Sequence, residues 1–186
     1  MLLVEVRWHG RGGQGIVTVS RLLAYAALLD GKHVQAFPEF GPERRGAPVT
    51  GYTRISDEPI SIHSHIYSPN IVVIVDPTLL GKIDVISGLV EDGIVVANTE
   101  SAASELKTAL KIEKAKVYTV NATRIALDIL GRPIYNTAML GALVKASPLV
   151  KLESLDKVVR ERFPGGVGEK NVAVIKKAYE EATGIE

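Results

Sequence analysis

The chain contains no cysteine in its 186 residues. This absence excludes disulfides, thiolate nucleophiles, and thiolate ligands for structural zinc or iron–sulfur clusters. If the protein takes part in redox chemistry, the metal clusters must therefore be held by another chain.

Charge of one sign and long apolar runs are also missing. The 22 basic and 21 acidic residues give a formal net charge of +1, which does not favour nucleic acid as a partner. No apolar run reaches the roughly 20 residues that span a bilayer. Glu5 and Arg7 interrupt the apolar N-terminal stretch, so it does not resemble a signal peptide. We expect a cytoplasmic protein with no membrane partner, folded as one domain over residues 1–186.

Short apolar, β-branched runs alternate with amphipathic segments along the chain. This alternation predicts an α/β fold with helices on both faces of a sheet. Strands are expected at Leu3–Trp8, His33–Phe37, Val49–Ile55, Pro59–His63, Ile71–Val75, Gly93–Ala97 and Lys116–Val120. Helices are expected at Gly15–Asp30, Ala102–Leu110, Thr123–Leu130, Thr137–Lys145, Leu152–Phe163 and Asn171–Ala182, with Pro164–Gly168 separating the last two.

The three residues Ser56–Glu58 form a short link between two of these expected strands. Such a link predicts an antiparallel hairpin of Val49–Ile55 with Pro59–His63. The fold class is therefore α/β, a three-layer α/β/α, Rossmann-like arrangement whose mainly parallel, mixed sheet contains an inserted antiparallel hairpin.

A glycine-rich turn between the first strand and the first helix is the strongest local motif. Gly10, Gly12 and Gly15 fit the pattern G-x-G-x-x-G, and Gly13 adds a fourth glycine. Glycines allow positive φ and close approach of a ligand, and the following helix N-terminus favours an anion. The same motif also occurs in plain tight strand-to-helix connections, and this alternative stays open.

The turn differs from that of a simple dinucleotide enzyme. Such enzymes normally place an acidic residue at the end of the second strand, where this chain has Phe37-Pro38. Arg11 and Gln14 are large hydrogen-bond donors within the turn. Arg11 could pair with a phosphate or carboxylate, or could be solvated. Gln14 could bind an amide or backbone group, or could cap the helix.

Several polar residues are given structural interpretations. Asp76, Asn98 and Asn121 follow strands, where such residues usually cap the next helix or shape the turn. His63 and His65 alternate along one expected strand, but no third ligand stands at a recognisable spacing. We therefore expect no metal site in this chain.

A series of motifs along the chain resembles the gamma subunit of pyruvate:ferredoxin oxidoreductase, a member of the 2-oxoacid:ferredoxin oxidoreductase family. The motifs that carry this resemblance are Arg7–Gly15, Gln35–Pro38, Glu43–Val49, Thr53–Ile55, Asp57–Ile60, Asp76-Pro77, Asn136, Leu140–Ala142 and Glu169–Asn171. They occur in the family's order over nearly the whole chain.

The resemblance implies a subunit without catalytic residues of its own. Thiamine diphosphate, Mg²⁺ and [4Fe-4S] clusters would be held by partner subunits, alpha, beta and delta. The complex would convert a 2-oxoacid and coenzyme A (CoA) into acyl-CoA and CO₂ and reduce ferredoxin. The lack of cysteine fits this division of labour independently. The isolated chain is expected to be inactive.

The resemblance also implies a site that faces CoA and the thiamine-bearing subunits. Its expected residues are Gly10, Arg11, Gly12, Gly13, Gln14, Gly15, Glu43, Arg44, Arg45 and Gly46. The helix N-terminus could hold a phosphate of CoA, or the charged residues could contact a partner subunit; we favour a mixture with the interface role slightly ahead. Ala47 follows the pyruvate-type pattern and favours pyruvate as the 2-oxoacid. The alternative is a stand-alone nucleotide-binding enzyme or regulatory module.

Overall fold

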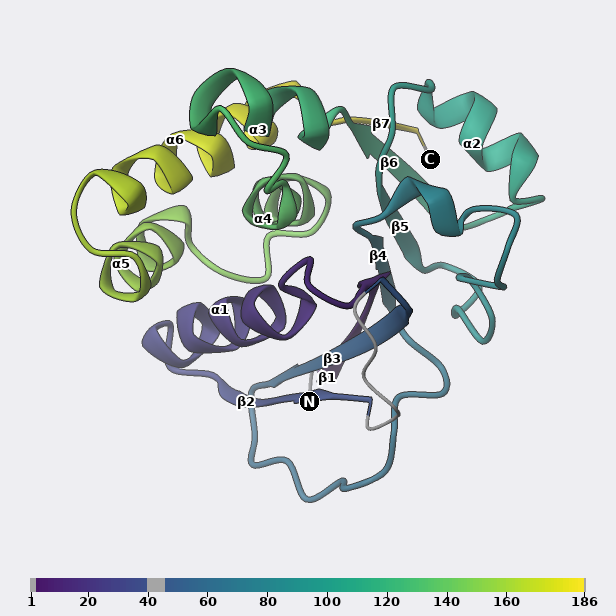
Figure 1. The fold of residues 1–186 in the computed structure, drawn as a ribbon. Helices are drawn as coiled ribbons and strands as arrows, with labels where there is room; N and C mark the ends of the chain where they lie inside the picture. The colour runs from purple at the N-terminus through teal and green to yellow at the C-terminus, as the bar shows by residue number, and fades with distance from the viewer. Residues whose placement is uncertain (1–2, 40–45, 186) are drawn as a thin grey trace.

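A computed structural model describes residues 3–39 and 46–185 of the chain. One sheet has the strand order β2–β3–β1–β4–β5–β6–β7 (Figure 1). The strands are β1 (Leu3–Arg11), β2 (His33–Pro38), β3 (Pro48–Ser56), β4 (Ile71–Ile74), β5 (Ile94–Asn98), β6 (Lys116–Val120) and β7 (Thr183–Ile185). Strands β1, β4, β5 and β6 pair in parallel, whereas β3 is antiparallel to β1 and β2, and β7 is antiparallel to β6.

Helices cover both faces of this sheet, which confirms the expected α/β class with a mainly parallel, mixed sheet (Figure 1). The helices are α1 (Ile16–Leu29), the 3₁₀ helix η1 (Pro77–Leu79), α2 (Ala103–Ala109), α3 (Ala122–Leu130), α4 (Asn136–Ala146), α5 (Leu152–Arg162) and α6 (Gly166–Glu181). Helices α1 and α3 to α6 form a thick layer on one face, and η1 and α2 lie on the other.

The two hydrophobic cores follow from the alternation of side chains along the strands. On β4, Val73 packs into the core beneath the thick helical layer together with Trp8. Val72 and Ile74, its neighbours on the same strand, pack on the opposite face with Leu106 of α2. Because β4 is buried on both faces, it consists of apolar β-branched residues throughout.

The expected hairpin of Val49–Ile55 with Pro59–His63 is wrong. Residues 59–63 form no strand, and β3 instead pairs with β2 and β1. The buried guanidinium of Arg54 explains the difference, because it donates to the carbonyl oxygens of Ile62 (3.4 Å) and Ser64 (2.8 Å). These bonds hold the segment across the face of the sheet, so the antiparallel hairpin is β2–β3.

Two further differences occur near the C-terminus. Helix α6 begins at Gly166 rather than Asn171, so part of the expected Pro164–Gly168 separator is helical. Gly165 (φ 70°) precedes the helix, and a Cβ on Gly168 would lie 2.1 Å from the carbonyl oxygen of Phe163. Here glycine permits a close turn between two helices rather than a loop. Strand β7 was missed because three residues carry too little pattern to predict a strand.

The interpretation of the polar residues after the strands as caps is confirmed for two of them. Asp76 accepts a hydrogen bond from the Thr78 N–H, and Asn121 accepts one from the Arg124 N–H at the start of α3. Asn98 accepts from the Thr123 N–H and donates to the carbonyl oxygen of Val75, so it ties β5 to α3 and β4.

Candidate functional site

The glycine turn has a backbone that requires glycine. Gly13 and Gly15 have positive φ values of 93° and 74°, which side-chain-bearing residues rarely adopt. A Cβ on Gly15 would lie 2.3 Å from the Asn136 amide nitrogen, and one on Gly10 would lie 2.3 Å from Ile16 Cδ1. No side chain caps the N-terminus of α1, so the turn presents backbone there without a competing oxygen.

Gln14 is bonded inside the chain. Its carbonyl oxygen accepts the N–H of Arg11 (2.7 Å), and its amide nitrogen donates to Asp76 Oδ2 (2.5 Å) and to the Tyr135 hydroxyl (3.0 Å). Gln14 therefore joins the turn to η1 and to the start of α4. Burial raises the pKa of Asp76, but hydrogen bonds from Thr78 and Gln14 and the charge of Arg11 outweigh it, so the net pKa lies below its ordinary value.

Arg11 is likewise used within the chain. Its guanidinium donates to the Thr78 hydroxyl (2.9 and 3.0 Å) and to the carbonyl oxygen of Gly46 (3.0 Å), and it lies 3.3 Å from Asp76 Oδ2. The sequence predicts a phosphate or carboxylate partner for Arg11, or a solvated arginine. In the structure its partner is the carboxylate of Asp76, and Arg11 braces the turn against two neighbouring loops.

Gly46 lies beside the glycine turn, so the structure brings these two predicted site segments together. The Gly12 N–H donates to the carbonyl oxygen of Ala47 (2.9 Å), and the Gly46 N–H donates to the carbonyl oxygen of Gly12 (3.1 Å). The remaining predicted residues of this loop, Glu43, Arg44 and Arg45, lie outside the described residues.

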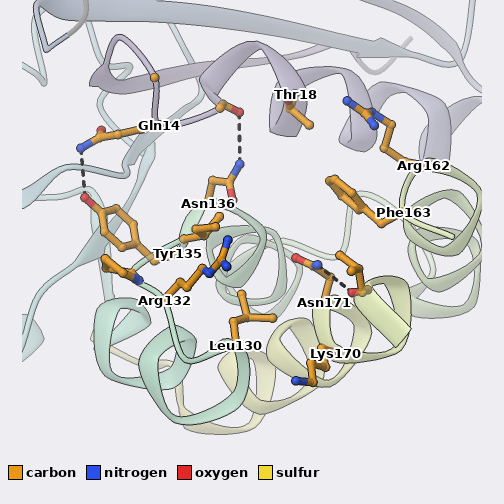
Figure 2. A pocket seen from close by; sticks show the side chains of 15 residues that line it. Gln14, Thr18, Leu130, Arg132, Tyr135, Asn136, Arg162, Phe163, Lys170 and Asn171 are labelled. Atoms are coloured by element: carbon orange, nitrogen blue, oxygen red, sulfur yellow. Dashed lines mark hydrogen bonds between the residues drawn. The ribbon is translucent and has the colours of Figure 1, made fainter. Parts of the chain in front are cut away.

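A pocket of about 580 Å³ opens on the other side of the turn, between the starts of α1, α4 and α6 (Figure 2). Figure 2 shows Gln14 and Tyr135 joined at one end and Arg162 with Phe163 at the other. Its lining residues are Gly13, Gln14, Gly15, Thr18, Leu130, Arg132, Pro133, Ile134, Tyr135, Asn136, Arg162, Phe163, Val167, Lys170 and Asn171. We call it the α1–α4–α6 pocket.

The charge of this pocket is entirely positive. Arg132, Arg162 and Lys170 line it, and no carboxylate does. Among the described residues, none of these three cations forms an ion pair; the Arg162 guanidinium lies 5.0 Å from the centre of the Phe163 ring. Three cations around helix N-termini favour an anion, and phosphate in particular.

Two buried asparagines fix the helix ends around the pocket. Asn136 donates to the carbonyl oxygen of Gly15 (3.4 Å) and accepts the Thr137 N–H (3.0 Å). Asn171 accepts the Thr137 hydroxyl (2.8 Å) and donates to the carbonyl oxygen of Val167 (2.8 Å). This network ties α1, α4 and α6 together, because it joins Gly15 before α1, Asn136 and Thr137 of α4, and Asn171 of α6.

Most of the residues that line this pocket are not predicted as site residues from the sequence, although some of them belong to recognisable motifs. Asn136, Lys170 and Asn171 belong to motifs that carry the family resemblance, and all three line the same pocket as Gly13 and Gly15. Arg132 and Arg162 belong to none of these motifs.

No metal centre is evident in the part of the chain that is described. Within it, no three His, Cys, Asp or Glu side chains lie close enough together to hold an ion. None of the described helices is long and apolar enough to cross a membrane.

Comparison with known proteins identifies the family. The model of the pyruvate ferredoxin/flavodoxin oxidoreductase family matches residues 5–181. The chain belongs to this family. It is 54% identical over 178 residues to the common gamma subunit of the pyruvate/ketoisovalerate oxidoreductases of Pyrococcus furiosus, covering 96% of both chains. It is 51% identical to the pyruvate synthase subunit PorC of Methanothermobacter marburgensis, covering 96% of this chain and 97% of the relative.

Solved structures of the family support the same assignment. The pyruvate oxidoreductase subunit PORC of Thermotoga maritima superimposes over all of both chains with a TM-score of 0.90 at 40% identity. A 2-oxoglutarate:ferredoxin oxidoreductase from Magnetococcus marinus, at 20% identity and a TM-score of 0.68, shows the same fold over 30% of its chain. The predicted family, the gamma subunit of 2-oxoacid:ferredoxin oxidoreductases, is confirmed, and the chain is an enzyme subunit of this type.

Proposed function

We propose that this gamma subunit binds the phosphates of CoA in the α1–α4–α6 pocket and supports the thiamine-bearing subunits of a pyruvate:ferredoxin oxidoreductase. The complex would convert pyruvate and CoA to acetyl-CoA and CO₂ and pass the electrons to ferredoxin. One observation carries the CoA part of the proposal: Arg132, Arg162 and Lys170 line a carboxylate-free pocket at the starts of three helices.

The rest of the lining suits the remainder of CoA. Leu130, Ile134, Phe163 and Val167 supply apolar walls against which an adenine ring or a pantetheine chain can pack. A hydrogen bond to a charged group contributes about 1.5–3 kcal/mol, so two such contacts to phosphate would give about 3–6 of the roughly 8 kcal/mol of a micromolar affinity.

Thiamine diphosphate, Mg²⁺ and the [4Fe-4S] clusters are assigned to the alpha, beta and delta partner subunits. The chain has no cysteine to ligate a cluster, which supports this assignment. No nucleophile is needed from this chain, because thiamine and the CoA thiol supply the reacting atoms. Pyruvate is favoured as the 2-oxoacid by the Methanothermobacter marburgensis and Thermotoga maritima relatives and by Ala47, whereas the Pyrococcus furiosus relative is common to pyruvate and ketoisovalerate oxidoreductases.

In this arrangement the phosphate lies against the backbone of the glycine turn and not against its side chains. Arg11 and Gln14 are already bonded within the chain, so they shape the turn rather than bind phosphate. Gly13 and Gly15 still border the pocket, where they leave room for a phosphate near the start of α1. A stand-alone nucleotide-binding module would instead show saturable binding of NAD, FAD or ATP to the purified chain.

Steady-state kinetics of the assembled complex test the CoA proposal. Lys170→Ala and Arg132→Ala should each raise KM for CoA about tenfold, because each removes a charge-assisted contact worth about 1.4 kcal/mol or more. KM for the 2-oxoacid should stay unchanged. Lys82→Ala, at an exposed position outside the pocket, is the matched control. Unchanged KM for CoA in both pocket variants would refute the assignment.

A further inference from the structure

Helix α1 has an outer face that is almost free of charge. The helix contains a single charged residue, Arg21, in 14 residues. Its exposed side chains are Arg21, Tyr25, Leu28 and Leu29, and the last three keep 54%, 55% and 47% of their surface accessible. A helix that is apolar on all sides is normally buried, so this face has the composition of an interface.

A groove runs along this face between α1 and α5. Leu22, Tyr25, Leu28 and Leu29 of α1 and Val158, Glu161 and Arg162 of α5 line a hollow of about 330 Å³. It continues into a second hollow of about 220 Å³ lined by Val17, Thr18, Arg21, Leu22, Tyr25 and Arg162. We call the two together the α1–α5 groove. Thr18 and Arg162 also line the α1–α4–α6 pocket, so the groove lies next to it.

The charges of the groove are unbalanced. Arg21 and Arg162 have no carboxylate partner among the described residues, and Glu161 is the one acidic side chain in the lining. An occupant that buries the apolar floor must come close to both guanidinium groups. The surface that best complements the groove is therefore a row of apolar side chains with a carboxylate side chain beside it.

We propose that the α1–α5 groove is the docking site for an amphipathic helix of another subunit of the oxidoreductase. Arg21, Tyr25 and Leu28 are spaced i, i+4 and i+7, which is the spacing at which one helix contacts another. The partner helix places its apolar side chains on Tyr25, Leu28 and Leu29 and a carboxylate beside Arg21. This inference rests on the proposed function, because it presupposes a multi-subunit complex.

A partner helix accounts for the surface better than a second copy of this chain does. A symmetric pair brings two copies of the same face together, with Glu161 alone to balance Arg21 and Arg162 on each copy. The same partner helix also forms a wall of the α1–α4–α6 pocket, since Arg162 borders both spaces.

Co-expression of the full chain with the other subunits tests this proposal. Leu29→Glu should weaken assembly at least about tenfold, because it places a charge in an apolar contact. Leu127→Glu on α3 is the matched control, since Leu127 is also 47% exposed but lies outside the groove. Arg21→Glu should weaken assembly as well, and Arg21→Lys should retain it. Size-exclusion chromatography with light scattering gives the readout, and circular dichroism reports folding of each variant.

Three results would overturn the proposal: wild-type assembly of Leu29→Glu, equal loss in Leu127→Glu, or a dimer of the chain alone that Leu29→Glu dissociates. If Leu29→Glu does not fold, Arg21→Glu decides, because it changes an exposed charge. The CoA proposal fails separately. Lys170→Ala changes KM for CoA without changing assembly, whereas Leu29→Glu acts on assembly first.

Discussion

The close approach of Gly15 to Asn136 makes a quantitative prediction about stability. Gly15→Ala forces a side chain into the left-handed region at φ 74°, which costs about 1–2 kcal/mol. Its Cβ would also lie 2.3 Å from the Asn136 amide nitrogen, so the amide must move and lose its bond to the Gly15 carbonyl oxygen. That loss adds about 1 kcal/mol.

Gly31→Ala, just beyond the other end of α1, is the matched control. Gly31 has φ 80°, but an added Cβ would meet nothing within 4 Å. The conformational cost and the change in the unfolded chain are therefore similar in the two variants, and their difference reports the contact with Asn136. We expect Gly15→Ala to lose about 1 kcal/mol more than Gly31→Ala.

Urea denaturation of the full chain measures this difference, and KM for CoA in the assembled complex gives a second readout. Because Asn136 lines the α1–α4–α6 pocket, Gly15→Ala should also raise KM for CoA, whereas Gly31→Ala should not. Equal destabilisation of the two variants would show that the close approach does not matter and would refute the reasoning.

Two further predictions concern buried polar groups. Burial first, and then the charge of Arg7, lower the pKa of His9 from 6.5 to about 4, so the unfolded chain binds more protons than the folded one between these values. The free energy of unfolding should therefore fall by about 3 kcal/mol as the pH drops from about 6.5 to 4. Urea titrations at a series of pH values measure this fall. His9→Gln should abolish it, whereas His33→Gln, at an exposed position, should not. Gln14→Leu removes one donor to Asp76, so the pKa of Asp76 should rise and stability at pH 7 should fall by about 1–3 kcal/mol; an unchanged urea midpoint would contradict this.

The sequence predicts the sheet well where burial is two-sided. Ile71–Val75 and Gly93–Ala97 are recognisable because strands covered on both faces are nearly continuous apolar runs. Residues 59–63 have the same alternation as a half-buried strand but form none. The difference depends on Arg54, whose guanidinium binds carbonyl oxygens of the neighbouring segment, and the alternation of apolar and polar residues does not contain that side-chain contact.

The sequence indicates where the pocket lies, but it does not predict most of the side chains that line it. The glycines of the turn predict a backbone with positive φ, and Gly13 and Gly15 do line the pocket. The roles of Arg11 and Gln14 depend on Thr78, Asp76 and Tyr135, which are distant in sequence and approach only in the folded chain. The same is true of the cations, because Arg132, Arg162 and Lys170 come from three separate segments.

A structure of the assembled oxidoreductase with CoA bound tests the central claim most directly. The account predicts CoA phosphates within hydrogen-bonding distance of Lys170 and Arg132, facing Gly13–Gly15 at the start of α1. CoA phosphates held elsewhere, with the α1–α4–α6 pocket filled by side chains of a partner subunit, would contradict it.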